Sequence, residues 1–384
     1  MSLLGSSRLF PISLVVAAVA VACSEEERTV KHWVYFGTGA SHIYVSAFDP
    51  VSGQVGTPRE AAEIGRPGFL AIHPSADILY AVGRDTREGS PPEGFAVAFR
   101  IDTATGDLQE INRGPTAGRG ASHVAVNASA TVLAAVNYGD GNTVSLALKA
   151  DGRIGELVSD LPHSGSSAHP QRQTGPHPHS ANFTPDDNFL IVPDLGTDEL
   201  VAYSVDPSTA RLARRPDPQV KMAPGSGPRH MTFHSNGRWA YVINELASTI
   251  TVLEYATGTG ALEPVQTIST LPGDYDGPAN TTAEVLVHPN GRFLYGSNRG
   301  SNTIAVFAIE PSTGRLSPRE LESTGGDWPR NFRLSPDGAF LLVANQRSDD
   351  VHVFRVDSQT GALTPSGDSV PVPGPMCVRF VPAQ

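Results

Sequence analysis

Short apolar runs, separated by turns rich in Gly, Pro, Asn and Asp, recur from about residue 33 to residue 382. Within many runs apolar and polar residues alternate, as in residues 249–255 and 303–307. This period of two indicates half-buried strands, and the Gly-bearing turns between them indicate antiparallel hairpins. No segment beyond residue 22 has a convincing helical period. The pattern therefore predicts an all-β protein.

One unit of this pattern is repeated along the chain. Residues 227–245 have near copies at 282–299 and 329–345, and residues 375–382 repeat only its first half. Weaker copies complete a series whose equivalent positions are His73, Asn127, Thr184, His234, His288, Ser335 and Val381. Four short strands about every 50 residues are typical of the blade of a β-propeller.

The number of copies predicts a seven-bladed β-propeller with four antiparallel strands in each blade. Six complete units occupy residues 66–366, and the seventh is split between the two ends of the chain. Its inner strand is expected at residues 376–382 and its outer strands near 33–36 and 42–49. Pairing the C-terminal strand with the N-terminal strands closes the ring and hides the sheet edges. Two smaller β-domains are the alternative, which the regular spacing and the lack of a linker disfavour.

The N-terminus has the pattern of an export signal. Arg8 precedes an apolar run over residues 9–22, which ends in small residues before Cys23 and is short for a membrane span. The sequence around Cys23 resembles a bacterial lipobox, so we expect lipidation there; a freely secreted protein and an uncleaved anchor are the alternatives. The expected organisation is a signal peptide at 1–22, a short tether at 23–32 and a single propeller domain at 33–384. The expected location is outside the cytoplasm, on a membrane only through the lipid, facing the periplasm or the cell exterior.

Composition excludes several classes of protein. The chain has 28 Lys and Arg against 39 Asp and Glu, a net charge of −11, so a general nucleic-acid binder is disfavoured. The two cysteines, Cys23 and Cys377, do not make a disulfide-stapled fold, and lipidation of Cys23 would leave no pair. Nothing in the sequence indicates an oligomeric state.

Polar residues gather at equivalent positions of the repeat. In a propeller, the loop entering the first strand and the loop joining the second and third strands share one face of the ring. We call each of the seven equivalent positions, from His73 to Val381, the repeat marker of its unit. His179, Arg229 and Arg330 lie five positions before a repeat marker. Four before it lie His123, His230 and Glu284, and eleven after it lie Glu245 and Arg299. These side chains are therefore expected at one mouth of the central channel.

This set of residues suggests ester chemistry on an anionic molecule. Several arginines on one concave surface suit a carboxylate, a phosphate or a developing oxyanion. A histidine and a glutamate beside them are suited to general base catalysis. A wet channel that carries satisfied polar groups without any chemistry is the alternative. Four histidines lie from His163 to His179, but no paired Cys or His-Glu-x-x-His spacing accompanies them, so no metal or other cofactor is expected.

Five motifs carry a resemblance to a known family. They are Gly-Pro-His-Pro-His-Ser-Ala-Asn from residue 175, Gly-Pro-Arg-His-Met from 227, Asn-Glu-Leu from 244, Ser-Asn-Arg-Gly-Ser-Asn from 297 and Gly-Pro-Met from 374. Over about residues 34–382 the chain resembles the lactonase family of seven-bladed propellers, which includes bacterial 6-phosphogluconolactonases and fungal carboxy-muconate lactonising enzymes. The resemblance implies active-site positions at His179, Arg229, Glu245 and Arg299. The remaining candidates for substrate binding are His123, His177, His230, Glu284 and Arg330.

The expected function is metal-independent hydrolysis of a sugar-type lactone, with a small-molecule lactone or sugar acid as the partner. Arg229 and Arg299 are expected to hold the anionic group and the oxyanion, and either His179 or Glu245 to activate water. An exported propeller that binds an anionic ligand or a protein without catalysis is the alternative, since the fold hosts many functions. A lactone-forming cycloisomerase acting on a dicarboxylate is a third possibility.

Overall fold

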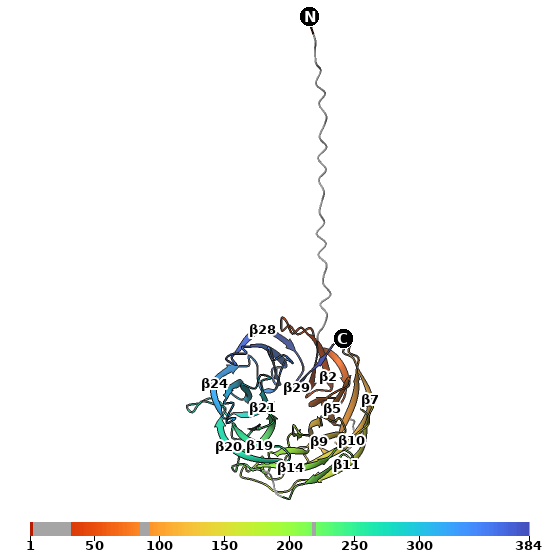
Figure 1. The fold of residues 1–384 in the computed structure, drawn as a ribbon, viewed down its shortest axis with the longest axis vertical. Helices are drawn as coiled ribbons and strands as arrows, with labels where there is room; N and C mark the ends of the chain where they lie inside the picture. The colour runs from red at the N-terminus through yellow and green to blue at the C-terminus, as the bar shows by residue number, and fades with distance from the viewer. Residues whose placement is uncertain (3–31, 85–92, 217–219, 384) are drawn as a thin grey trace.

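The computed structural model is a ring of seven four-stranded sheets around a central axis (Figure 1). It describes residues 1–2, 32–84, 93–216 and 220–383. Residues 3–22 of the predicted signal peptide, the predicted lipidation site Cys23 and the predicted tether up to residue 31 lie outside the described residues. In the described part of the chain all regular structure is β, and no helix is present that could cross a membrane.

The first three complete blades follow one another along the chain, each beginning with its innermost strand. Their strands are β4 (Phe69–Ile72), β5 (Ile78–Arg84), β6 (Glu93–Ile101) and β7 (Leu108–Arg119); β8 (Ala121–Val126), β9 (Val132–Asn137), β10 (Asn142–Leu148) and β11 (Ile154–Pro162); and β12 (Asn182–Phe183), β13 (Phe189–Asp194), β14 (Glu199–Asp206) and β15 (Arg211–Arg214), with β16 (Val220–Lys221) also paired to β14.

The next three complete blades have the same order of strands from the axis outward. They are β17 (Pro228–Phe233), β18 (Trp239–Asn244), β19 (Thr249–Ala256) and β20 (Ala261–Ser269); β21 (Thr281–Val287), β22 (Phe293–Arg299), β23 (Thr303–Ile309) and β24 (Leu316–Ser323); and β25 (Pro329–Leu334), β26 (Phe340–Asn345), β27 (Asp350–Val356) and β28 (Leu363–Pro371).

The seventh blade contains both ends of the chain, as predicted. The C-terminal strand β29 (Pro375–Pro382) pairs antiparallel with β1 (His32–Thr38), followed outward by β2 (His42–Phe48) and β3 (Arg59–Glu63). The pairs run from His32 with Pro382 to Thr38 with Pro375. This ladder closes the ring and removes the open edges that a linear array of sheets would have.

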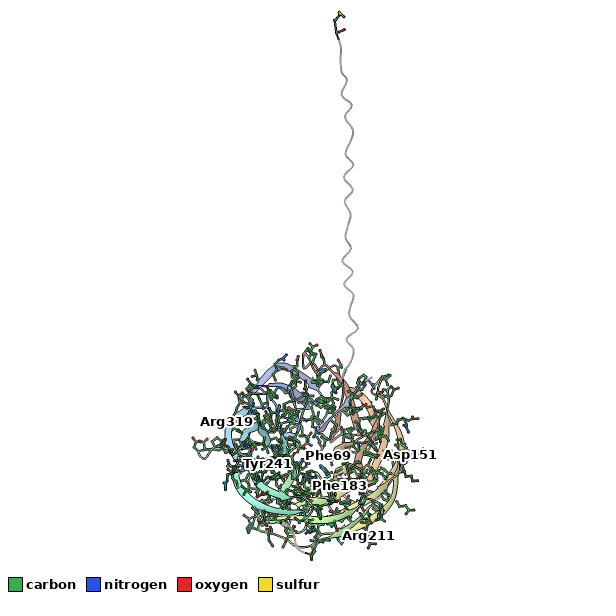
Figure 2. The ribbon with its side chains drawn as sticks, in the orientation of Figure 1. Phe69, Asp151, Phe183, Arg211, Tyr241 and Arg319 are labelled. Carbon is green, nitrogen blue, oxygen red and sulfur yellow. The ribbon has the colours of Figure 1, made fainter. Side chains whose placement is uncertain are left out.

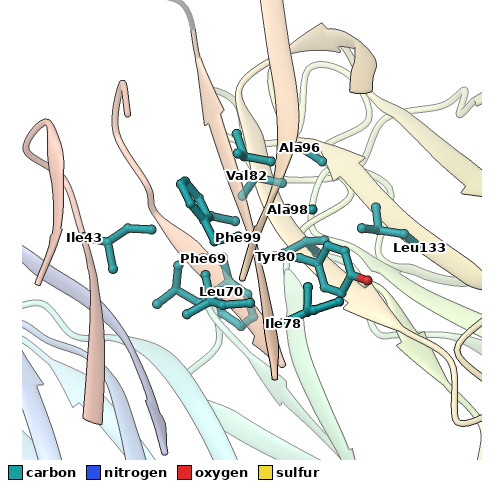
Figure 3. Close-up of a cluster of buried hydrophobic side chains, with 14 of the residues drawn as sticks. Ile43, Phe69, Leu70, Ile78, Tyr80, Val82, Ala96, Ala98, Phe99 and Leu133 are labelled. Carbon is teal, nitrogen blue, oxygen red and sulfur yellow. The ribbon is translucent and has the colours of Figure 1, made fainter. Parts of the chain in front are cut away.

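Apolar clusters lie around the ring, most of them between neighbouring blades. The largest joins the blades of β1, β4 and β8, and includes Ile43, Tyr80 and Leu133 (Figure 3). The sheets therefore bury both faces, which explains why the second strand of most blades is a continuous apolar run rather than an alternating one. Phe69 and Phe183 lie near the centre of the ring, whereas Asp151, Arg211 and Arg319 lie at its rim (Figure 2).

Within the described residues, a tyrosine hydroxyl donates to a turn glycine of the neighbouring blade at four places. Tyr35 donates to the carbonyl of Gly106 at 2.9 Å and Tyr80 to that of Gly152 at 2.7 Å. Tyr241 and Tyr295 repeat the contact with Gly314 and Gly361. Each of these glycines has a positive φ of 67° to 79°, and a Cβ there would lie within 2.7 Å of a side chain of the adjoining blade. Only glycine combines this turn with such close packing of the blades.

Candidate active site at one mouth of the channel

A β-bulge recurs where the inner strands begin. The pairing of β8, β17, β25 and β29 with their neighbours slips by one residue, at Ser122, Arg229, Arg330 and Met376. A bulged residue is left out of the ladder and its side chain is re-aimed. Consecutive residues such as Arg229 and His230 can therefore both serve the channel, although in a regular strand they would point to opposite faces.

A cavity of about 470 Å³ occupies the mouth at which the inner strands begin. It is lined by Arg66, Gly68, Gly83, Arg84, Gly120, Ala121, Ser122, Tyr138, Arg172, His179, Glu245, Thr281, Arg299, Trp328, Arg330 and Met376. Five arginines and a single carboxylate make this lining strongly cationic, in a chain whose net charge is −11. Such a surface attracts and concentrates small anions.

Glu245 is the centre of the charged network. This buried carboxylate accepts hydrogen bonds from Arg172 Nη2 at 2.7 Å and Arg229 Nε at 3.0 Å, and Arg299 Nη2 lies 2.9 Å from it. Burial alone would raise the pKa of Glu245, but the arginines outweigh that effect and hold the pKa at about 2. Glu245 is therefore a permanent anion that fixes three cations, and it has little affinity for a proton.

Arg229 and Arg299 are anchored by main-chain carbonyls as well. Arg229 Nη1 donates to the carbonyl of Ala283 at 2.7 Å, and Arg299 Nη2 donates to that of Thr282 at 2.5 Å. Arg229 is buried beneath the cavity and does not line it, whereas Arg299 does line it. Arg299 is therefore better placed than Arg229 to meet a molecule in the cavity.

Three other arginines of the lining have no carboxylate partner among the described residues. In the described part of the chain, no Asp or Glu oxygen lies within ion-pair distance of Arg66, Arg84 or Arg330. Burial, together with the neighbouring Arg299, lowers the pKa of Arg330 to about 10, so Arg330 is still cationic at neutral pH. The side chains of all three arginines line the cavity that a ligand would enter.

His179 is the one histidine among the residues that line this cavity. Its backbone N–H donates to the carbonyl of Pro193 at 2.9 Å, which fixes the segment that enters β12. Its ring is buried, and its Nδ1 has no hydrogen-bond partner among the described residues. Burial, followed by repulsion from Arg229, holds the pKa of His179 well below its usual range. His179 is therefore a neutral imidazole at pH 7.

Arg172 enters the site from the long connection between β11 and β12. Its Nη2 also donates to the Tyr138 hydroxyl at 3.1 Å, so that one guanidinium joins Tyr138 to Glu245. His177, from the same connection, stacks on the Tyr138 ring at 4.4 Å between centroids, and its Nδ1 lies 2.8 Å from the carbonyl oxygen of Tyr138. His177 does not line the cavity and instead supports Tyr138, which does.

His123, His230 and Glu284, the candidates four positions before a repeat marker, lie deeper along the channel axis than the residues of the mouth. His230 Nδ1 lies 3.0 Å from Glu284 Oε1, and Asn331 donates to the other oxygen of Glu284. The His123 ring packs 3.9 Å from that of Phe69. None of His123, His230 and Glu284 lines the cavity at the mouth. They form a layer beneath it, and a direct role in substrate binding remains a prediction.

Arg66 and Trp328 line the cavity but were not among the candidates from the sequence. Both stand at a position of the repeat where other units have a glycine. Seven residues before the marker, Gly120, Gly227 and Gly374 have positive φ, as glycine allows. At the same position stand Arg66 with φ 51° and Trp328 with φ 68°. A non-glycine residue held in this conformation is strained, and such strain is common at functional sites. The replacement of this glycine by Arg66 and by Trp328 is visible in the sequence and could have indicated that both residues belong to the site.

No group of three His, Cys, Asp or Glu side chains within the described residues is placed to hold a metal ion. Of the four histidines from His163 to His179, three make ring contacts within the fold and His179 lines the cavity. His163 is buried, with Nδ1 2.7 Å from Asp194 Oδ2 and Nε2 2.8 Å from both the Thr143 and the Tyr203 hydroxyl oxygens. Metal-independent chemistry remains a prediction.

The fold and the cavity define a seven-bladed propeller with a cationic site at one end of its axis. The family model "Lactonase, 7-bladed beta-propeller" matches residues 33–380, and the chain belongs to this family. A 6-phosphogluconolactonase of Bacillus subtilis (strain 168) is 33% identical over 355 residues, 91% of this chain and 99% of the relative. A 6-phosphogluconolactonase of Formosa agariphila is 34% identical over 301 residues, 78% of this chain and 82% of the relative.

The solved structures agree with this assignment. The periplasmic gluconolactonase of Pseudomonas aeruginosa superposes with a TM-score of 0.84 at 33% identity, covering 91% of this chain and 99% of that structure. The seven-bladed fold and the lactonase class that the motifs implied are thereby confirmed. The chain is a lactone-hydrolysing enzyme acting on a small molecule.

Proposed function

We propose that the cavity hydrolyses a sugar lactone that carries an anionic group, with 6-phosphogluconolactone as the model substrate. The observation that carries this proposal is the group of three arginines, Arg66, Arg84 and Arg330, which have no carboxylate partner among the described residues. Guanidinium groups bind phosphate through paired hydrogen bonds. The names of the relatives from Bacillus subtilis and Formosa agariphila support the same choice.

In the proposed mechanism, Arg299 donates to the lactone carbonyl oxygen. Water attacks the carbonyl carbon, and its proton passes to His179 as the tetrahedral oxyanion forms beside the guanidinium. The bond between the carbonyl carbon and the ring oxygen then breaks, the leaving alkoxide takes the proton back from His179, and the product is the open hydroxy acid. Glu245 keeps Arg299 and Arg172 in place without reacting. Donors held ready for a developing oxyanion often supply the largest part of catalysis.

The choice of His179 over Glu245 as the base follows from their surroundings. Glu245 is saturated by three guanidinium groups and its pKa is about 2, so a proton from water gains little by moving to it. His179 is neutral and lines the cavity, so its ring can accept a hydrogen bond from water. The Nδ1 atom of His179 has no hydrogen-bond partner among the described residues, whereas both oxygens of Glu245 are held by guanidinium groups.

The test is a stopped-flow or pH-indicator assay with 6-phosphogluconolactone and unphosphorylated gluconolactone, each corrected for spontaneous hydrolysis and repeated with a chelator. We expect chelator-resistant acceleration, with kcat/KM at least about tenfold higher for the phosphorylated lactone. Arg330→Gln should narrow that ratio, whereas Arg211→Gln, which removes an exposed arginine at the rim, should leave it unchanged. Equal rates on both lactones would refute the anionic subsite. If neither lactone is hydrolysed faster than in buffer, the result would favour a propeller that binds an anionic ligand or a protein without catalysis.

We also propose that the chain is exported, with Cys23 lipidated. The apolar run at residues 9–22 supports export, and so does the similarity to the Pseudomonas aeruginosa gluconolactonase, which is periplasmic. Metabolic labelling with a fatty-acid probe tests the lipid. Labelled wild-type protein in the membrane fraction and unlabelled Cys23→Ser protein in the soluble fraction are expected. An unlabelled wild-type protein would refute lipidation.

A further inference from the structure

A second cavity of about 440 Å³ lies at the other end of four inner strands. Strands β4, β8, β25 and β29 begin beside the first cavity and end beside this one. It is lined by Leu70, Ala71, Ile72, His123, Val124, Ala125, Val126, Arg333, Leu334, Pro336, Arg379 and Phe380. No residue lines both cavities. The second cavity is therefore separate from the proposed active site.

The side chains two positions before the repeat markers explain the shape of the second cavity. On the four strands that line it these residues are Ala71, Ala125, Arg333 and Arg379. The two alanines leave space beside the axis, and the two arginines stand on the neighbouring strands β25 and β29, which contact each other. A cavity of this volume is large enough for a small organic acid.

The two arginines bring positive charge to the wall of this cavity without forming an ion pair among the described residues. Within the described residues, neither Arg333 nor Arg379 has a carboxylate oxygen at ion-pair distance. Arg379 Nη1 donates to the carbonyl of Val378 at 2.7 Å, and its guanidinium lies 4.7 Å above the ring of Phe69. Burial, followed by repulsion from Arg379, lowers the pKa of Arg333 to about 10, which still leaves it cationic at neutral pH.

Glu284 is the carboxylate whose charge acts on both arginines, but its oxygens already contact other side chains. Glu284 has one oxygen at His230 and the other at Asn331, so its hydrogen-bonding capacity is directed away from the arginines. Two partly buried cations of like charge repel each other, and an oxyanion that accepts from both removes the repulsion. The apolar residues around them, such as Leu70 and Phe380, restrict water and strengthen that attraction.

We propose that this second cavity is a binding site for a small oxyanion, a phosphate or an organic carboxylate, held by Arg333 and Arg379. The site is distinct from the proposed active site and does not rest on the lactonase mechanism. Inorganic phosphate and a sugar carboxylate such as gluconate present the same chemistry to the arginines. Only the carboxylate adds an organic body that can contact the apolar wall, so the two sources can be told apart.

A row of three imidazoles connects the two cavities. His179 lines the first cavity and His123 lines the second, and the ring centroid of His230 lies 5.2 Å from the former and 5.5 Å from the latter. An anion near His123 favours its protonated form, because the opposite charge stabilises it. Occupation of the second cavity should therefore be felt electrostatically along this row.

The test is isothermal titration of the protein with sodium phosphate and with sodium gluconate at constant ionic strength. Arg330→Gln serves as the background, because it weakens anion binding in the first cavity. In that background, Arg333→Gln and Arg379→Gln should each weaken binding about tenfold. Arg333→Lys, which keeps the charge, should retain most of the affinity. Arg211→Gln, an exposed arginine on β15, is the matched control and should change nothing.

The two ligands distinguish the sources. Tighter binding of gluconate than of phosphate supports an organic carboxylate, and the reverse supports free phosphate; either result supports the site. Ala125→Leu, which fills the cavity without touching the arginines, should weaken gluconate more than phosphate. Unchanged affinities in Arg333→Gln and Arg379→Gln, with melting temperatures that show both variants folded, would overturn the proposal. Lactone kinetics measured on the same variants report separately on the first cavity.

Discussion

Replacing Glu245 with Gln removes one negative charge and almost no volume from the centre of three guanidinium groups. Glu245 is 3% exposed, and the nitrogen partners of its carboxylate lie at 2.7, 3.0 and 2.9 Å. The variant leaves Arg229 and Arg299 buried without their counter-charge. Breaking a buried ion pair by removing one partner typically costs about 3–5 kcal/mol. The shift of the Glu245 pKa from 4.5 to about 2 corresponds to about 3 kcal/mol, in agreement with the lower value.

This loss converts into a shift of the melting temperature. The propeller has roughly 350 residues from His32 to Pro382, and about 2.1 cal/mol/K per residue gives an unfolding entropy of about 0.7 kcal/mol/K. A loss of about 3 kcal/mol therefore lowers Tm by about 4 °C. The value of kcat/KM should fall about a hundredfold, because Arg172 and Arg299 lose the anion that positions them.

The assay is thermal unfolding at one scan rate, combined with lactone kinetics. Glu254→Gln is the matched control, since Glu254 forms an exposed pair with Arg238 at 2.9 Å and should matter by less than about 1 kcal/mol. The folded-state pKa of Glu245 is depressed, so its contribution is complete above pH 4.5 and is lost as pH falls toward 2. The two melting curves should therefore converge in acid. A variant with wild-type Tm and wild-type kinetics at pH 7 would refute the central role of this carboxylate.

Three further predictions concern the same cavity. Arg299→Ala should lower kcat/KM by about 10²–10³-fold while the protein remains folded by circular dichroism, and unchanged kinetics would remove Arg299 from the mechanism. The wild-type profile of kcat/KM against pH should stay level through pH 6.5 and decline only at lower pH, because the depressed pKa of His179 keeps it neutral; an inflection at or above pH 6.5 would contradict its role as base. Arg66→Gly removes the backbone strain of a residue with φ 51°, so the variant should melt no lower than the wild type. Its KM for the phosphorylated lactone should rise, and an unaltered KM would exclude Arg66 from the anionic subsite.

The spacing of the repeat was sufficient to predict the blades and the closure of the ring. Each blade needs the same four strands, so the positions from His73 to Val381 recur with the fold itself. Strand β3 escaped prediction because Arg59–Glu63 is mostly polar and solvent-facing, with no alternating apolar face. The inner strand β12 is reduced to Asn182–Phe183, because the long connection before it enters the channel instead of pairing regularly.

Equivalent positions predicted which residues approach the axis, but not their depth along it. His179 and Arg330 line the first cavity, whereas His123 belongs to the second, and His230 and Glu284 lie between them. The bulges separate neighbours in this way, and a bulge depends on pairing between strands that a linear pattern does not reveal. The partnership of Glu245 with Arg172 was equally hidden, because Arg172 belongs to a connection that the repeat does not contain.

The pairing of β29 with β1 also sets the order in which the molecule can be completed during synthesis. Met376 contributes to the first cavity and Arg379 to the second, and both belong to β29. A nascent chain can assemble its six internal blades, each from contiguous sequence, but neither cavity acquires its full wall until β29 has been synthesised. A chain cut short before β29 would lose both binding sites at once and expose the unpaired edge of β1. Both cavities therefore depend on a strand that is made after all the other blades.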